Sequence, residues 1–175
     1  MGAAMSPDHL PGERVVLRRA RIDDAEALHR VIHSPGVHEW WTDHPIDRLR
    51  DDLAADDEEF VVFMIERDGE VVGVVQYGQE LDPQYRHASI DVSVLAGHHR
   101  EGIASDAIRT LARHLIDDLG HHRIVIDPAA HNAVAIACYT SLGFRPVGVM
   151  RRYERGLDGT FHDGLLMDLL ADELT

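Results

Sequence analysis

The sequence predicts one α/β domain in which helices cover a mixed β-sheet. Its 175 residues are enough for a single domain with a substantial hydrophobic core. Apolar residues repeat with the period of a strand in some segments and with that of a helix in others. The two kinds of segment alternate without repeats, linkers or low-complexity tracts. We expect residues 1–12 to form a flexible N-terminal segment and residues 13–175 to form the domain.

The N-terminal part of the domain predicts a strand and two helices. Residues 13–20 (ERVVLRRA) alternate enough for a first strand. Residues 23–34 have helical periodicity, with acidic side chains in the first turn, where they favour the helix dipole. A second helix is expected over 45–57, with Pro45 near its start.

The middle of the chain carries its strongest hairpin signal, Asp68-Gly69. The apolar runs FVVFMIE (60–66) and EVVGVVQY (70–77) flank this pair and predict two antiparallel strands. HASIDVSVL (87–95) predicts a further strand.

The C-terminal half predicts a long helix over 100–120 and a short apolar strand over 123–127. The segment IDPAAHNAVAIACYTSLGF (126–144) predicts a strand end, a loop and a helix. PVGVM (146–150) and FHDGLLMDLL (161–170) complete the sheet as strands. This order of elements gives a sheet with helices packed on it, an α/β sandwich.

The composition restricts the class of partner. Thirty-one acidic and 17 basic residues give a formal charge of −14, which disfavours nucleic acid or an anionic membrane and suits a cationic partner. A merely soluble acidic protein is the alternative. The single cysteine, Cys138, allows no intrachain disulfide. Since neither a signal peptide nor a membrane-spanning run is evident, we expect a cytoplasmic protein.

A glycine-containing turn (VLAGHHREGIASDAI, 94–108) connects a predicted strand to a predicted helix. Gly97, Gly102 and Ala104 keep this turn free of bulky side chains. The first helical amides, from Gly102 to Ser105, would point outward at the positive end of the helix dipole, which suits a pyrophosphate. The signal alone is weak, because many helices begin this way and the segment lacks the Lys-Ser/Thr of a P-loop.

A second segment places Asn132, Ala135 and Tyr139 on one narrow stripe of a helix, since each residue turns the helix by about 100°. A polar residue, a small residue and a phenol do not suit a simple buried face. We therefore expect this stripe to lie along a ligand.

Together the two segments resemble the GNAT superfamily of acyl-CoA-dependent N-acetyltransferases. The family signature is Arg/Gln-x-x-Gly-x-Gly/Ala, then Asn, Tyr seven residues later, and Gly-Phe. Its counterparts here are Gly102-x-Ala104, Asn132, Tyr139 and Gly143-Phe144. The leading basic or amide position falls on His99, a departure from the pattern, with Arg100 beside it. The resemblance implies a mixed, mostly antiparallel sheet flanked by helices, with acetyl-CoA as cosubstrate.

The resemblance also assigns the cofactor side of the site. In the family, the strand before the glycine turn splays from its neighbour, and its backbone holds the pantetheine arm; Val94 and Leu95 match those positions. Asn132 would orient the same arm, and the Tyr139 hydroxyl would lie by the sulfur as general acid for the leaving thiolate. The expected cofactor-binding residues are Val94, Leu95, His99, Arg100, Gly102, Ile103, Ala104, Ser105, Asn132, Ala135 and Tyr139.

Asp127 is the expected catalytic base. An alkyl amine with a pKa of about 10.4 is mostly protonated at neutral pH, and only its neutral form attacks. A carboxylate at the end of the strand could take that proton directly or through water. The spacing Asp-Pro-x-x-x-Asn-x-x-Ala-x-x-x-Tyr-x-x-x-Gly-Phe is similar to that of aminoglycoside 6′-N-acetyltransferases, where the matching Asp is the base. The alternative is that Asp127 and Pro128 only cap a turn.

The acceptor side is also expected from this resemblance. HEWW (38–41) resembles the Glu-Trp-Trp of the substrate wall in those enzymes. Aromatic faces hold sugar rings and attract ammonium groups, although one tryptophan could instead belong to the core. We therefore expect a small polycationic amine, such as an aminoglycoside antibiotic, as acceptor. The expected acceptor-binding residues are Trp40, Trp41, Gln76, Tyr77, Asp91 and Asp127.

Other functions stay open at this point. The C-terminal segment 151–170 resembles the ending of GNAT enzymes that acetylate protein N-termini, including ribosomal ones, in which a hairpin helps shape a peptide groove. A non-catalytic acyl-CoA-binding module is a third class, against which Tyr139 and Asp127 argue. We expect no metal, because the helical pair His29 and His33 lacks a third ligand. Strands at the C-terminal edge of the sheet allow a homodimer.

Overall fold

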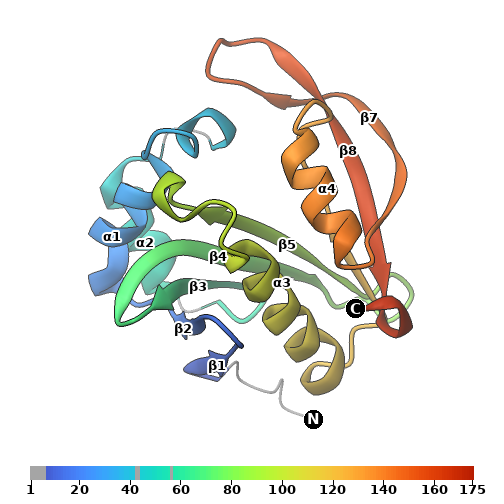
Figure 1. Ribbon diagram of the computed structural model, residues 1–175, viewed down its shortest axis with the longest axis horizontal. Coiled ribbons are helices and arrows are strands. Elements are labelled where there is room, and N and C mark those ends of the chain that lie inside the picture. The colour runs from blue at the N-terminus through green and yellow to red at the C-terminus, as the bar shows by residue number, and fades with distance from the viewer. Residues whose placement is uncertain (1–6, 42–43, 56) are drawn as a thin grey trace.

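The computed structural model describes residues 7–41, 44–55 and 57–175. Its eight-stranded sheet has the order β1-β2-β3-β4-β5-β6-β8-β7 (Figure 1). Neighbouring strands are antiparallel except β5 and β6, which pair in parallel. The expected mixed, mostly antiparallel sheet with flanking helices is therefore confirmed.

The elements follow the expected order along the chain. The strands are β1 (His9–Pro11), β2 (Val16–Arg19), β3 (Phe60–Arg67), β4 (Glu70–Glu80), β5 (His87–Val94), β6 (Arg123–Ile126), β7 (Arg145–Arg155) and β8 (Phe161–Leu170). The principal helices are α1 (Ala25–Ile32), α2 (Ile46–Ala54), α3 (Ile103–Arg113) and α4 (Ala133–Ser141). The helix expected over 100–120 begins later, because residues 100–102 form the turn before α3, and it ends in a π-helical turn.

The N-terminal boundary differs from the expectation. Strand β1 lies within the segment expected to be flexible, and it pairs with β2. The physical reason is that Leu10 is buried in the core, which fixes a strand too short to be recognised by its periodicity. The expectation is thus wrong for residues 9–11, while residues 1–6 lie outside the described residues.

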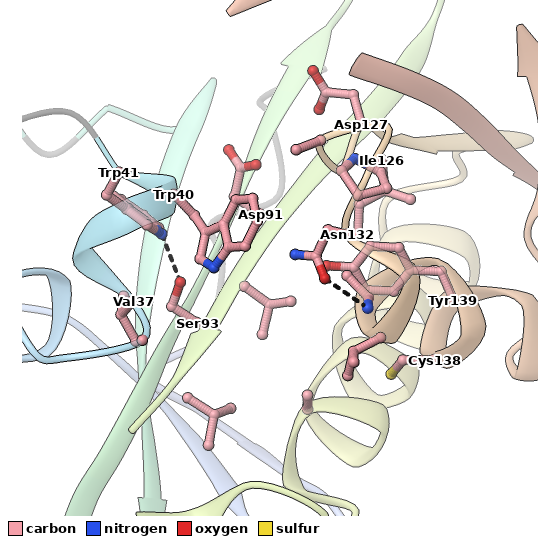
Figure 2. A pocket seen from close by; sticks show the side chains of 18 of the residues that line it. Val37, Trp40, Trp41, Asp91, Ser93, Ile126, Asp127, Asn132, Cys138 and Tyr139 are labelled. Carbon is pink, nitrogen blue, oxygen red and sulfur yellow. Dashed lines mark hydrogen bonds between the residues drawn. The ribbon is translucent and has the colours of Figure 1, made fainter. Parts of the chain in front are cut away.

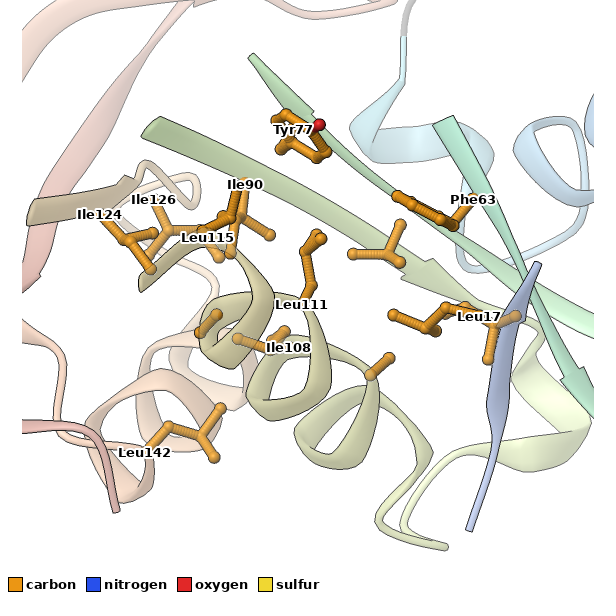
Figure 3. Packing of buried hydrophobic residues seen from close by; sticks show 14 of the residues in the cluster. Leu17, Phe63, Tyr77, Ile90, Ile108, Leu111, Leu115, Ile124, Ile126 and Leu142 are labelled. Carbon is orange, nitrogen blue, oxygen red and sulfur yellow. The ribbon is translucent and has the colours of Figure 1, made fainter. Parts of the chain in front are cut away.

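Helices cover both faces of the sheet, and the alternation of side chains along β3 shows how. Phe63 and Ile65 point to the face covered by α3, whereas Met64 packs with α1 and α2 on the other face. On the α3 face, buried side chains from the strands meet Leu111 and Leu115 (Figure 3). This packing fixes where α3 begins and ends relative to the sheet.

The parallel strands β5 and β6 are paired over only two residues each before they diverge. Only Ala88 with Ile124 and Ser89 with Val125 are in register, although β5 continues to Val94. The outer part of β5 is therefore paired with β4 alone. The expected splay is confirmed, and it leaves backbone groups of β5 available on the side facing α4.

Candidate active site

A cavity of about 1220 Å³ lies where β5 and β6 separate. The end of β5, the first turn of α3, the loop after β6, α4 and part of β7 line it. Figure 2 shows Trp40 and Trp41 on one wall and Asn132 and Tyr139 on the other. The cavity is far larger than a water site and is large enough for a cofactor together with an acceptor.

The turn before α3 forms one end of this cavity. Gly102 is the residue before the helix and has a left-handed backbone with φ of 76°, which a residue with a β-carbon adopts only with strain. Ile103, Ala104 and Ser105 follow in the first helical turn and also line the cavity. Their amide groups lie at the positive end of the helix dipole, so this end of the cavity favours an anion.

His99 lines the cavity but its ring is engaged with the protein. Its Nε2 lies 2.8 Å from the carbonyl oxygen of Val94. A carbonyl only accepts hydrogen bonds, so Nε2 must carry the proton. The ring thus ties the turn to the end of β5. Arg100 beside it also lines the cavity, with a left-handed backbone at φ of 65°.

The stripe predicted on α4 faces the cavity. Asn132, Ala135 and Tyr139 all line it. Asn132 also caps the helix, because its Oδ1 accepts a hydrogen bond of 3.1 Å from the backbone N–H of Ala135. Its amide nitrogen points toward the space between the two walls (Figure 2). The residue therefore has one bond fixed by the fold and a donor left for a ligand.

Tyr139 is the most enclosed polar side chain on this wall, with 8% of its surface exposed. Burial raises the pKa of its phenol well above the ordinary value, and the nearby Cys138, Asp91 and Asp127 add to the shift. The phenol is therefore protonated throughout the neutral range. It can donate a hydrogen bond into the cavity, but it is a weak acid.

Asp127 lies directly after β6 and also lines the cavity. Its carboxylate caps no turn among the described residues. The Tyr153 phenol interacts with it instead, and this interaction is the main reason why the pKa of that phenol rises to about 12. Tyr153 comes from β7, a strand distant in sequence from Asp127.

Two further carboxylates, Asp91 on β5 and Glu154 on β7, line the cavity with Asp127. Asp91 is open to the cavity solvent but has protein on most sides. This partial burial raises its pKa, and the charge of Asp127 adds to the rise, whereas a 3.2 Å hydrogen bond from Gln76 opposes it. Burial is also the main cause of the raised pKa of Glu154, and the negative charges of Asp127 and Asp91 raise it further. Three carboxylates that line one cavity favour a cationic guest.

The tryptophan pair forms the opposite wall at the carboxylate end. The indole N–H of Trp41 donates a hydrogen bond of 2.6 Å to the Ser93 hydroxyl, which fixes that ring to β5. Trp40 has its ring centroid 5.3 Å from that of His131. Both tryptophans line the cavity, so neither is a simple core residue.

Three expected site residues lie elsewhere. Tyr77 is buried in the core on the α3 face, and Leu95 packs with the cluster beneath α1 and α2. Gln76 does not line the cavity and reaches the site only through Asp91. Leu95 directly follows β5, and its side chain packs away from the cavity that Val94 lines.

Among the residues that the sequence analysis missed are those that β7 contributes to the site. Met150, Tyr153, Glu154 and Arg155 reach the cavity from β7. The run RRYERG that follows Met150 could have pointed to these residues, but in the sequence analysis this segment was related only to a peptide groove.

The described part of the chain contains neither a group of potential metal ligands nor a helix that could span a membrane. Its His, Cys, Asp and Glu side chains nowhere gather in a group of three that could hold a metal ion. No described helix has both the length and the hydrophobicity needed to cross a membrane.

Comparison with known proteins identifies relatives of the whole chain. The sequence model of the acetyltransferase (GNAT) family matches residues 23–144. An uncharacterized N-acetyltransferase, p20 of Bacillus licheniformis, is 27% identical over 172 residues, which are 92% of this chain and 95% of the relative. RimJ of Mycobacterium smegmatis, solved in complex with CoA-disulfide, superposes with a TM-score of 0.84 and 29% identity over 96% of this chain and 90% of RimJ.

A shorter match concerns a protein with a defined acceptor. The ribosomal protein bS18-alanine N-acetyltransferase of Escherichia coli strain K12 is 35% identical over 82 residues. This match spans 45% of the present chain and 52% of that enzyme. Half of the relative's length is therefore not represented in the match.

Proposed function

The chain belongs to the GNAT family of acetyltransferases, and from this premise we propose that it acetylates a primary amine of a small polycationic molecule resembling an aminoglycoside. One observation carries the choice of acceptor: Asp91, Asp127 and Glu154 line a single cavity together with Trp40. Carboxylates attract ammonium groups, and an indole face binds both a cation and the apolar face of a sugar. The family's cosubstrate, acetyl-CoA, supplies the activated acetyl thioester.

The other end of the cavity fits that cosubstrate. Gly102 provides the left-handed turn before α3, which a residue with a β-carbon would adopt only with strain. The unpaired edge of β5 offers backbone hydrogen bonds to an extended arm. Asn132 would hold the same arm with its free amide nitrogen, and Val94 and Ala135 would border it.

We assign the base to Asp127. The acceptor arrives largely as an ammonium ion, and the carboxylate takes one of its protons, directly or through water, so that the nitrogen lone pair becomes available. The nitrogen then forms a bond to the acetyl carbon as the carbon–sulfur bond breaks, and it releases its second proton to water to become the amide. The phenol of Tyr153, which interacts with Asp127, borders the carboxylate in this step.

We assign the donor at the leaving sulfur to Tyr139. Its phenol is protonated at neutral pH because burial raises its pKa. As negative charge grows on sulfur, the hydroxyl donates to it and can pass its proton, which water then replaces. The raised pKa makes complete transfer unfavourable, so hydrogen bonding supplies most of the gain.

A second candidate acceptor is the N-terminal amine of a protein. It is favoured by a hollow of about 220 Å³ that shares Trp40 and Glu154 with the main cavity and continues along the β7–β8 hairpin at Gly156 and Leu157. A peptide could extend along this surface. The similarity to the bS18-alanine N-acetyltransferase is in keeping with that acceptor.

A thiol-release assay separates the two candidates. The protein is supplied with acetyl-CoA and, in separate reactions, with aminoglycosides, simple monoamines and peptides that begin with alanine. We expect kcat/KM to be highest for the aminoglycosides. Turnover of peptides alone would reverse the ranking, and acetyl-CoA binding without turnover of any amine would favour a non-catalytic module.

A further inference from the structure

We propose that Arg14, on the turn between β1 and β2, is the cation that binds the pyrophosphate of acetyl-CoA. This assignment concerns the cofactor side alone, so it does not depend on which acceptor the enzyme uses. The turn before α3 carries a histidine where the family pattern has a basic or amide side chain, and its ring is held by the Val94 carbonyl. Arg100 lines the cavity beside this histidine, and Arg14 offers a second cation from another part of the chain.

Arg14 lies directly against the phosphate-binding turn. A β-carbon placed on Gly102 would lie 3.4 Å from the Arg14 Nε, 3.6 Å from its Cδ and 3.8 Å from its Cζ. The guanidinium group thus borders the residue from which the first amides of α3 begin. Gly102 itself lines the cofactor end of the cavity. The anion-binding amides and the guanidinium can therefore contact the same phosphate groups.

A buried carboxylate holds the Arg14 backbone in this place. Asp106, in the first turn of α3, is 3% exposed. Its Oδ1 accepts the N–H of Glu13 at 3.2 Å, and its Oδ2 accepts those of Arg14 at 2.7 Å and Val15 at 3.1 Å. Three hydrogen bonds to one buried carboxylate tie the β1–β2 turn to the helix that forms the pyrophosphate site.

The close approach depends on a glycine. A β-carbon on Gly12 would lie 2.6 Å from the Asp106 Oδ2 and 2.7 Å from the Thr110 hydroxyl oxygen, so no larger residue fits there without a shift. Gly12 therefore allows the β1–β2 turn to pack closely against Asp106 and Thr110 of α3. Asp106 acts as a positioning residue, and Arg14 is the residue that contacts the cofactor.

The Arg14 guanidinium is available to a ligand. Within the described residues no acidic side chain forms an ion pair with it, although the chain has a net charge of −14. By contrast, the neighbouring Glu101 is paired with Arg67 and His98. A guanidinium binds phosphate oxygens through two parallel N–H groups, which suits a pyrophosphate.

The test is a set of binding measurements by titration calorimetry without any acceptor. The ligands are CoA, dephospho-CoA, which keeps the pyrophosphate, and pantetheine, which lacks all phosphate. We expect Arg14→Gln to weaken CoA and dephospho-CoA by about 10-fold each, with pantetheine unchanged. Arg113→Gln, the same charge change on the exposed far end of α3, should leave all three affinities unchanged.

A double-mutant cycle tests the positioning role of Asp106. In an Asp106→Asn background, Arg14→Gln should weaken CoA by less than about 3-fold, because the turn no longer holds the guanidinium in place. An Arg14→Gln effect that is absent, that is equal for pantetheine, or that Arg113→Gln reproduces would overturn the proposal. A loss of affinity for CoA with no loss for dephospho-CoA would show that Arg14 contacts the 3′-phosphate, which dephospho-CoA lacks. That result would also overturn the assignment.

Discussion

The two ends of the cavity are built in different ways. The cofactor end relies largely on backbone: the open edge of β5, the left-handed Gly102 and the first amides of α3. The acceptor end consists of side chains, including Trp40, Asp91 and Glu154, which come from elements far apart in the sequence. A motif of fixed spacing can therefore identify the first end, but not the second.

The ends also differ in charge. Arg100 and the helix N-terminus, with Arg14 beside Gly102, bring positive charge to the cofactor end, whereas Asp91, Asp127 and Glu154 bring negative charge to the acceptor end. An anionic cosubstrate and a cationic acceptor would each be directed to its own end. Substitutions at one end should therefore change the binding of one ligand and leave the other unaffected.

The largest effect is expected for the acceptor-end base. Asp127→Asn keeps the size of the side chain but cannot accept the amine proton at neutral pH, so kcat should fall by about 10²–10⁴-fold. Raising the pH should recover part of the rate, because more acceptor then arrives as neutral amine. The measurement is a pH–rate profile, with the exposed Asp117→Asn as matched control. An Asn variant that keeps its rate per folded molecule would remove Asp127 from the chemistry.

A smaller loss is expected for the donor at the sulfur. Tyr139→Phe removes only the hydroxyl, and kcat should fall by about 10²-fold, the low end for a general acid, because the raised pKa already limits proton transfer. The affinity for acetyl-CoA should stay nearly constant. Pre-steady-state kinetics that isolate the chemical step, with the exposed Tyr85→Phe as control, provide the test. An unchanged chemical step would exclude Tyr139.

The smallest effect concerns stability. The pKa of Asp91 in the folded protein is raised above 3.8, so the folded state binds its proton more tightly than the unfolded state does. The charge of Asp91 therefore costs stability above the folded pKa, and this cost disappears as the pH falls toward 3.8. Asp91→Asn should raise the Tm at pH 8 by about 1–3 °C and should have less effect at pH 5. A lower Tm at pH 8 would contradict this expectation.

The cofactor end could be predicted from sequence because its residues are close together in the chain. Asn132, Ala135 and Tyr139 follow one helical stripe, and Gly102 with Ala104 follows the start of a helix. Helical periodicity fixes such residues relative to one another without knowledge of the rest of the fold.

The acceptor end was predicted only in part because register decides which side chains reach it. The pairing of β7 with β8 shifts between Met150 and Glu154, and Arg152 in that interval has a φ of 52°. Such an irregularity changes which residues face the cavity, so simple alternation does not place Tyr153 or Glu154. The role of Arg14 was hidden for a related reason, since it depends on the long-range contact of Asp106 with the β1–β2 turn.

The central claim is that the acceptor end recognises a polycation. The most direct test is whether Glu154→Gln changes the preference of the enzyme for an aminoglycoside over a monoamine. The measurement is kcat/KM for an aminoglycoside and for a monoamine of similar pKa, with the wild type and the variant. The account predicts that the aminoglycoside value falls by about 10-fold, while the monoamine value and the affinity for acetyl-CoA stay unchanged. An equal loss for both amines would contradict charge recognition at this end of the cavity.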